Sequence, residues 1–153
     1  DLADDKNLLE AIKKSVELKA SVVAQDEKER GIRAALNYGH TFAHVVESET
    51  NYTGYLHGEA VAIGIVMANR LALKLGRISG TEEKKVKNLL EKYNLPTSYA
   101  IKNAEAFYDK FFLDKKTKDG KITFIIPSGI GGCEIVDDTP KNIVMEVLNE
   151  FLA

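Results

Sequence analysis

The spacing of apolar positions predicts a chain that is mostly helical. Apolar side chains recur every three to four residues across residues 6–24, which is typical of an amphipathic helix. Across residues 57–75 the pattern is apolar on nearly every side and stops at Gly76, which indicates a buried central helix that ends at a glycine. Residues 104–113 predict a further short helix.

Two more helices are indicated by residues that are common at helix N-termini. Thr81 is the expected N-cap of an amphipathic helix that ends near Pro96. Thr139 and Pro140 are expected to be the N-cap and the first residue of a last helix, which ends at about Leu152. Helices therefore dominate the predicted secondary structure.

Only one part of the chain has the composition of β-strands. Residues 121–127 and 133–136 are rich in β-branched side chains and are joined by Ser-Gly-Ile-Gly-Gly, which predicts a short hairpin. This glycine-rich joint does not lie between a strand and a helix, so we interpret it as a turn and not as a nucleotide-binding loop. We expect one mainly α domain over residues 1–153, with one short β-hairpin.

One predicted helix carries a polar stripe. It follows a charged connector at residues 25–31 and is expected to end near Glu47. At about 100° per residue, one face of this helix spans an arc of roughly 80° that holds a cation, an amide and two imidazoles. Such a face suits a pocket for a metal ion and an anionic, oxygen-rich ligand. The side chains of the stripe are Glu29, Arg33, Asn37, His40 and His44.

All three histidines of the chain fall within the eighteen positions 40–57. His40 and His44 are four residues apart, a spacing that allows two imidazoles on one helix face to bind one divalent ion. The ordinary alternative is a pair of hydrogen-bonded or surface histidines. The neighbouring Arg33 and Asn37, and His57 in a glycine-flanked turn, favour the metal site.

Three acidic residues are candidates for a further metal ligand, and spacing does not choose among them. They are Glu29, Glu47 and Glu59. Glu59 has a second interpretation, because a negative charge in the first turn of the helix at residues 57–75 favours the helix dipole.

The lysines give weaker signals. Lys19 interrupts the apolar pattern of the first helix, and Lys115 and Lys116 follow Asp114 just ahead of a glycine turn. Spacing alone favours solvated side chains for all three lysines.

The composition argues against some classes of partner. A formal net charge of −2 over 153 residues gives no electrostatic reason to expect nucleic acid or an anionic membrane as a partner. Cys133 is the only cysteine, which excludes an intrachain disulfide and favours a reducing compartment, the cytoplasm. We expect Cys133 to be a small core residue and not a nucleophile. No segment has the length of a membrane span, and the absence of an initiator Met favours a piece of a longer chain.

Four segments, taken in order, form one recognisable set. They are Lys19-Ala-Ser-Val-Val-Ala-Gln-Asp26-Glu27-Lys-Glu29-Arg-Gly31-Ile-Arg33, Leu36-Asn37-Tyr-Gly39-His40-Thr-Phe-Ala-His44, Leu56-His57-Gly58-Glu59-Ala60-Val61-Ala62-Ile63-Gly64 and Asp114-Lys115-Lys116. Together they closely resemble 3-dehydroquinate synthases. One departure is Ala43, which stands where that family usually has glycine, and we expect it to affect helix packing more than chemistry.

The resemblance implies a fold and an activity. The whole chain corresponds to the helical C-terminal domain of that family, and the family's N-terminal dinucleotide-binding domain, which brings NAD and one carboxylate metal ligand, has no counterpart in it. The family converts 3-deoxy-D-arabino-heptulosonate 7-phosphate into 3-dehydroquinate and phosphate in the shikimate route to aromatic amino acids, with NAD and zinc or cobalt. The resemblance therefore implies a sugar phosphate substrate, a homodimer of the full-length enzyme and no activity for the isolated fragment.

The same resemblance implies metal and proton-transfer roles. It makes His40 and His57 the metal ligands, together with a glutamate from the absent domain, whereas helical spacing alone would pair His40 with His44. It gives His44 a substrate contact and a part in moving protons, together with Glu29.

It also implies substrate contacts. Lys19 and Arg33 match residues that hold the substrate carboxylate and neighbouring oxygens. Asn37 and one lysine of the pair Lys115 and Lys116, preferably Lys116, match residues on the phosphate side.

Two alternatives remain open from the sequence. The first is a related sugar phosphate cyclase whose substrate has no carboxylate, although the paired charges of Lys19 and Arg33 favour a carboxylate. The second is a non-catalytic helical metal-binding module derived from such an enzyme.

Overall fold

The computed structural model describes residues 4–28, 31–113 and 121–153. Its chain divides into two compact units, Asp1–Leu36 and Asn37–Ala153, and each unit is described by itself. The mainly helical fold with a single short hairpin confirms the predicted fold class.

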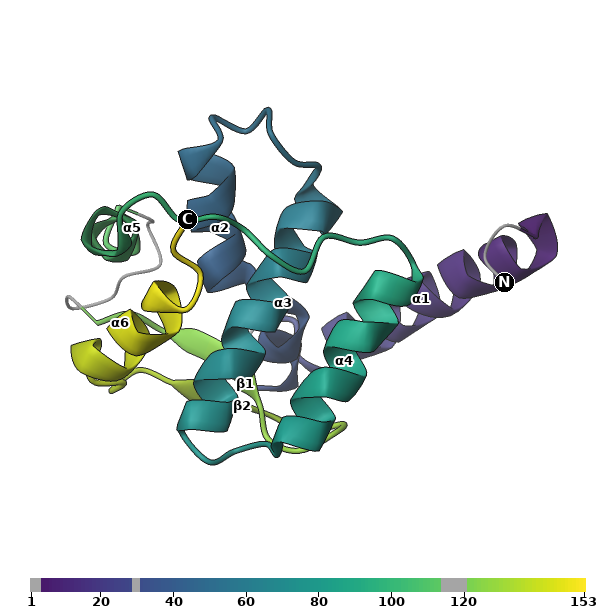
Figure 1. Cartoon of the computed structure of the whole chain (residues 1–153). Coiled ribbons are helices and arrows are strands. Elements are labelled where there is room, and N and C mark those ends of the chain that lie inside the picture. Colours follow the sequence, from purple (N-terminus) through teal and green to yellow (C-terminus); the bar gives the residue numbers. More distant parts are fainter. Residues whose placement is uncertain (1–3, 29–30, 114–120) are drawn as a thin grey trace. The chain divides into compact units, whose positions relative to one another are not determined.

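The first unit is built on one long helix, α1 (Asp5–Gln25), which matches the prediction for residues 6–24 (Figure 1). Asp4 is its N-cap, with a side chain that accepts a hydrogen bond from the backbone N–H of Lys6 at 3.3 Å. After α1, the carboxylate of Asp26 accepts hydrogen bonds from the backbone N–H of Gly31 at 2.7 Å and of Arg33 at 3.1 Å. These two bonds fix the turn that leads into a 3-10 helix, η1 (Ile32–Asn37).

The prediction of one continuous helix with a polar stripe is wrong. The 3-10 helix η1 ends at Asn37, and a separate helix, α2 (His40–Glu49), begins three residues later. Between them Gly39 has a φ of 78°, a left-handed conformation that is incompatible with a continuing right-handed helix. The arc of about 80° on a single helix therefore does not exist.

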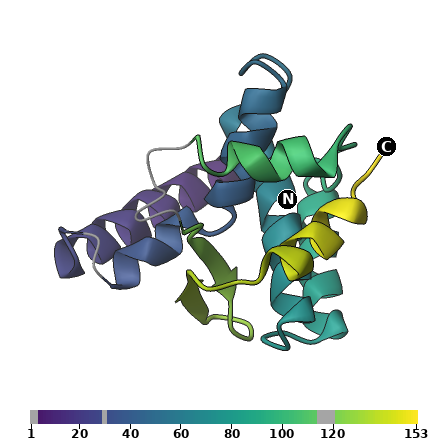
Figure 2. The same cartoon turned by 90° about the vertical axis from the view of Figure 1, so that its left-hand side faces the viewer.

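The second unit is organised around α3 (His57–Lys74), which is the predicted buried central helix. Gly76 has a φ of 70°, as expected for a glycine that ends a helix. Figures 1 and 2 show α3 in the middle of the second unit, where it packs against α2, α4, α6 and β1. The remaining elements are α4 (Gly80–Lys92), α5 (Ala104–Lys110), β1 (Phe124–Pro127), β2 (Cys133–Val136) and α6 (Lys141–Asn149).

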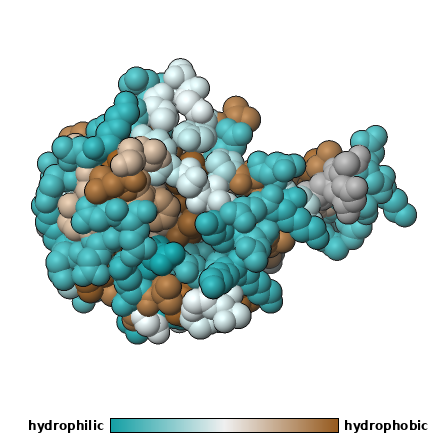
Figure 3. All heavy atoms as spheres, in the orientation of Figure 1, coloured by the Kyte–Doolittle hydropathy of each residue, from teal (hydrophilic) through white to brown (hydrophobic). Residues whose placement is uncertain are grey.

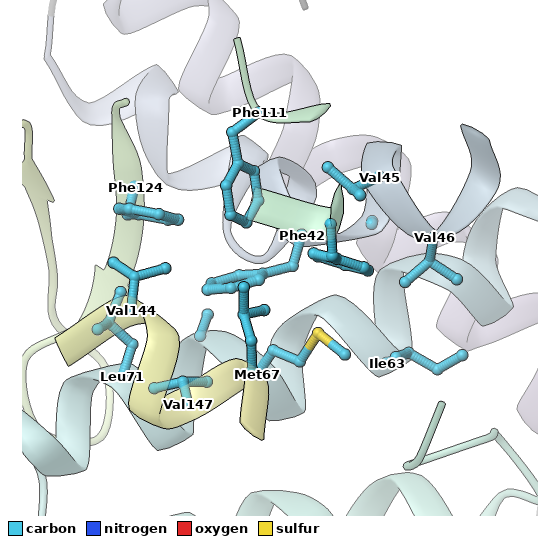
Figure 4. Packing of buried hydrophobic residues seen from close by; sticks show 14 of the residues in the cluster. Phe42, Val45, Val46, Ile63, Met67, Leu71, Phe111, Phe124, Val144 and Val147 are labelled. Carbon is cyan, nitrogen blue, oxygen red and sulfur yellow. The ribbon is translucent and has the colours of Figure 1, made fainter. Parts of the chain in front are cut away.

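The core of the second unit is aromatic on one side of α3. Phe42 is fully buried and stacks on Phe124 with ring centroids 5.1 Å apart, while Phe111 meets both rings edge to face at 5.5 Å. Figure 4 shows these rings beside Met67 and Leu71 of α3. Because each fully buried side chain of this size contributes about 1.5–3 kcal/mol, this cluster attaches α2, β1 and the end of α5 to α3.

The hairpin prediction is confirmed, with a shorter first strand. The antiparallel strands β1 and β2 pair from Phe124 opposite Val136 to Pro127 opposite Cys133. Cys133 itself is exposed, so its prediction as a core residue is wrong. The residue lies at the end of an edge strand, where alternate side chains face solvent.

Three helix ends differ from their predictions. The N-cap of α4 is Ser79 and not Thr81, because the backbone N–H of Glu82 donates to the Ser79 hydroxyl at 3.3 Å and the Glu82 carboxylate accepts from the backbone N–H of Ser79 at 2.8 Å. Helix α5 ends at Lys110 and continues only as a turn. Pro140 occupies the N-cap position of α6, ahead of the expected first-turn position, and α6 ends at Asn149.

The surface is mixed in polarity. In Figure 3, hydrophilic side chains cover α4, whose sequence is rich in lysine and glutamate, and apolar side chains form small separate patches on the second unit. None of the helices in the described ranges is long and apolar enough to span a membrane.

Candidate metal site

Helix α2 begins with His40 at a point where the backbone lies unusually close to α3. An ideal Cβ on Gly39 would lie 2.6 Å from the backbone nitrogen of Ile65, so only glycine fits there. The closeness of Gly39 to α3 fixes where α2 starts, and therefore where the imidazole of His40 is placed.

The three histidine rings lie next to one another. The ring centroids of His40 and His57 are 5.4 Å apart, and those of His40 and His44 are 5.8 Å apart. His57 is the first residue of α3, so the chain brings it to His40 from seventeen positions away through the loop between α2 and α3. The structure thus gathers the histidines that the sequence singled out, although on two helices.

Each of two histidines presents one ring nitrogen to an acceptor oxygen. Nδ1 of His57 lies 2.9 Å from Oε1 of Glu47, and Nδ1 of His40 lies 3.3 Å from the carbonyl oxygen of Tyr38. Because both partners are acceptors, Nδ1 of each ring carries the hydrogen in these contacts, and in the neutral ring the lone pair is then on Nε2.

This donor set fits two ligands of one divalent ion. In a tetrahedral zinc site, metal–nitrogen distances of about 2.0–2.1 Å put two imidazole ring centres about 5 Å apart. The separation of 5.4 Å between His40 and His57 agrees with that value, and a neutral imidazole with its lone pair on Nε2 is a form that binds metal. Across residues 4–28, 31–113 and 121–153, no three His, Cys, Asp or Glu side chains are grouped closely enough to hold a metal ion.

Two of the acidic candidates have local partners. The Glu59 carboxylate accepts a hydrogen bond from the backbone N–H of Leu56 at 2.8 Å, which supports its alternative interpretation as a charge at the N-terminus of α3. Glu47 contacts His57, as described above. The third, Glu29, lies outside the described residues.

The predicted substrate residues are divided between the two units. Lys19 is an exposed residue of α1, and Arg33 in η1 donates from Nη1 to the carbonyl oxygen of Glu27 at 2.6 Å. Asn37 is the first residue of the second unit and is half-buried. Lys115 and Lys116 lie outside the described residues.

The sequence analysis did not predict the hydrogen bond that holds Tyr38, the residue whose carbonyl oxygen contacts His40. The Tyr38 hydroxyl donates a hydrogen bond to Oδ1 of Asn69, a fully buried residue of α3. Burial raises the pKa of Tyr38 to about 12. The signal available in the sequence was Asn69 itself, an amide inside an otherwise apolar helix pattern.

A separate hollow of about 480 Å³ is bordered by α3, α4 and the end of the chain. Arg70 lies in it and pairs with Glu83 at 2.8 Å and with Glu150 at 3.2 Å. None of the predicted site residues that the structure describes lines this hollow.

The comparisons with known proteins agree on one family. Residues 1–117 match the model of the 3-dehydroquinate synthase C-terminal family. The chain is 61% identical over 151 residues to a 3-dehydroquinate synthase of Sulfurovum sp. (strain NBC37-1) and 60% identical over 151 residues to that of Sulfurimonas denitrificans. Each alignment covers 99% of this chain but 43% of the relative, so the chain spans less than half the length of these proteins.

Solved structures with the same fold are also known. A 2-deoxy-scyllo-inosose synthase complexed with carbaglucose-6-phosphate, NAD+ and Co2+ is similar with a TM-score of 0.79 and 25% identity, over 96% of this chain and 43% of that one. A 2-epi-5-epi-valiolone synthase from Streptomyces hygroscopicus subsp. jinggangensis 5008, with NAD+ and Zn2+ bound, has a TM-score of 0.79 at 23% identity, over 94% of this chain and 39% of that one, and shares the fold.

With a family model that covers most of its length and relatives at about three-fifths identity, this chain belongs to the 3-dehydroquinate synthase C-terminal domain family.

Proposed function

We propose that this chain is the C-terminal part of an enzyme that converts 3-deoxy-D-arabino-heptulosonate 7-phosphate into 3-dehydroquinate and phosphate, in the shikimate pathway. The observation that carries the proposal is the 61% identity, over 99% of the chain, to a relative named 3-dehydroquinate synthase. The neighbouring imidazoles of His40 and His57, with ring centroids 5.4 Å apart, support it, because the family's reaction depends on a metal.

The proposed cofactors are NAD and a zinc or cobalt ion. Support comes from the imidazole donors of this chain and from the related 2-deoxy-scyllo-inosose synthase structure, which holds NAD+ and Co2+. When bound, the metal supplies Lewis-acid polarisation of a substrate hydroxyl and NAD supplies a hydride acceptor. His40 and His57 are the proposed metal ligands, and the remaining ligand and the NAD site are assigned to the rest of the whole protein.

The other residues of the site are proposed to bind the substrate and to transfer protons. His44 lies beside His40 and is proposed to contact substrate and to move protons, together with Glu29. Lys19 and Arg33 are proposed to bind the substrate carboxylate, because a pair of cations holds an oxyanion by charge-assisted hydrogen bonds.

The phosphate side of the substrate is assigned to different residues. Asn37 and one of Lys115 and Lys116, with Lys116 preferred, are proposed to bind the phosphate. An amide donor and an ammonium group suit phosphate oxygens. Holding the leaving phosphate in place would let catalysis rest largely on positioning and charge stabilisation.

We extend the proposal to the whole protein. Residues 1–153 would form its helical metal- and substrate-binding domain, preceded by a dinucleotide-binding domain, in a cytoplasmic homodimer without nucleic-acid or membrane partners. The relatives support the additional domain because this chain covers only 43% of their length. The single cysteine and the net charge of −2 support the compartment and the partners.

The test is NAD-dependent phosphate release from the heptulosonate phosphate, measured with the full-length protein and with this chain alone. Only the full-length protein should release phosphate, and calorimetric titration of this chain alone should detect no micromolar NAD binding. A carboxylate-free sugar phosphate such as glucose 6-phosphate is the competing substrate. Turnover of that compound instead of the heptulosonate phosphate would replace this proposal with that of another sugar phosphate cyclase, and turnover of neither would leave a non-catalytic metal-binding module.

Variants of the full-length protein test the substrate class. Lys19→Ala and Arg33→Ala should each lower turnover about tenfold to a hundredfold, since each charge-assisted bond contributes about 1.5–3 kcal/mol. Zinc content should remain normal, because neither side chain is assigned to the metal. The matched control is Lys13→Ala on the same helix, whose exposed side chain pairs only loosely with Glu17 at 3.8 Å. Loss of metal, or wild-type kinetics, in both test variants would reject the assignment.

A further inference from the structure

The contact between His57 and Glu47 joins the start of α3 to the last turns of α2. Oε1 of Glu47 lies 2.9 Å from Nδ1 of His57. A carboxylate accepts hydrogen bonds and does not donate them, so the imidazole carries a hydrogen on Nδ1, and in its neutral form the lone pair is on Nε2.

The two partners differ in their freedom to move. The His57 side chain is 61% exposed, so its own packing does little to hold the ring, whereas the Glu47 side chain is 13% exposed and is held on α2. The backbone of His57 is fixed separately, because the adjacent Leu56 N–H donates to the Glu59 carboxylate. Beside the ring contact with His40, the Glu47 carboxylate is therefore the hydrogen-bond partner that restricts the rotation of the His57 ring.

The neighbouring acidic side chains have other interaction partners. Glu49, two residues further along α2, forms an ion pair with Lys110, and Glu59 accepts from the backbone at the start of α3. His40 has a neutral acceptor, the Tyr38 carbonyl oxygen, at the longer distance of 3.3 Å. Because a hydrogen bond to an ionised group is about twice as strong as a neutral one, the carboxylate holds its ring more firmly.

We propose that Glu47 is a positioning residue for the metal site, which holds His57 in the Nδ1–H tautomer and aims its Nε2 atom at the metal position, and is not itself a ligand. This inference rests on the proposed function, which makes His57 a metal ligand. A carboxylate behind a metal-binding imidazole fixes the ring orientation and makes the ring a stronger donor.

The experiment compares Glu47→Ala and Glu47→Gln with the control Glu49→Gln in the 153-residue chain. Nitrogen-15 NMR of the histidine rings, in the absence of metal and at mildly alkaline pH, reads the tautomer of His57 directly. Wild type, Glu47→Gln and Glu49→Gln should show the Nδ1–H form, because the glutamine oxygen still accepts. Glu47→Ala should show a mixture. If Glu47→Ala does not fold, Glu47→Met keeps the length of the side chain without the carboxylate and gives the same comparison.

The second readout is the zinc dissociation constant, from competition with a chelator. Glu47→Ala should bind zinc about ten to a hundred times more weakly than wild type, and Glu47→Gln should lie between the two. Glu49→Gln should match wild type.

Two different results would overturn the proposal, and they are distinguishable. An unchanged tautomer and unchanged zinc affinity in Glu47→Ala, with a large loss in His57→Ala, would reject the role of Glu47 alone. Unchanged zinc affinity in both His40→Ala and His57→Ala would reject the proposed metal ligands, and the role of Glu47 with them.

Discussion

The carbonyl oxygen of Gly39 occupies the space that a side chain on Gly64 would need. An ideal Cβ on Gly64 would lie 2.2 Å from that oxygen and 2.9 Å from the backbone nitrogen of Ala43. The start of α2 therefore rests directly on the backbone of α3, while the other end of α2 reaches the start of α3 through Glu47 and His57. Together these contacts show that α2 and α3 run antiparallel, which is what brings the histidine rings together.

Gly64→Ala should destabilise the second unit by at least about 2 kcal/mol, because the obstructing atoms belong to the backbone and cannot move without separating the two helices. Chemical unfolding followed by circular dichroism measures the change. The control is Gly80→Ala in α4, where an added Cβ has no neighbour within 4 Å and should be neutral or stabilise by up to about 1 kcal/mol. Equal effects of the two substitutions would contradict the close helix contact.

Ser79→Ala should lower the free energy of unfolding by about 0.5–2 kcal/mol, because it removes the hydroxyl that caps α4. Thr81→Ala, at the position that the sequence favoured as the cap, should change it by less than about 0.5 kcal/mol. Thermal or urea unfolding of both variants measures the difference. A larger loss of stability for Thr81→Ala than for Ser79→Ala would support Thr81 as the N-cap of α4, as the sequence predicted.

Tyr38→Phe should alter the stability of the protein at high pH. Burial raises the pKa of Tyr38 from 10.0 to about 12, so the folded state holds this proton more tightly than the unfolded state. The stabilisation is complete below pH 10 and is lost as the pH rises to about 12. For a half-buried group, the loss should be about 1–2 kcal/mol.

The phenylalanine variant should lose less stability than wild type between pH 10 and about 12, although it starts lower at neutral pH because Asn69 loses its partner. Urea unfolding at several pH values tests this, and the tyrosinate absorbance that develops near pH 12 should decrease in the variant. Parallel stability curves for the two proteins would show that Tyr38 titrates normally.

His40→Ala and His57→Ala should each weaken zinc binding to this chain more than His44→Ala. Two imidazoles without a carboxylate bind zinc weakly, so removal of either one should abolish measurable affinity. Chelator competition on the three single variants gives the order. A loss in His44→Ala as large as in His57→Ala would favour the pair on one helix face that spacing suggested.

Short-range sequence patterns were sufficient to predict most of the helices and the hairpin. The apolar spacing predicted α1 and α3 within a residue or two, because helix periodicity depends on neighbours in the sequence. The β-branched residues and the glycine-rich joint likewise predicted the hairpin. Helix ends were less accurate at Thr81 and Pro140, because several nearby residues are able to cap a helix and packing selects one of them.

By itself, the sequence determined the helical class, the central helix and the concentration of histidines near one place, since all of these follow from residue type and short-range spacing. Only the tertiary structure decided that the polar stripe is broken at Gly39, because that depends on how closely α2 packs against α3. It also decided that His57 approaches His40 as closely as His44 does, and that Glu47 supports His57. Contacts between different helices are fixed by packing and loop geometry, which periodicity along one helix does not encode.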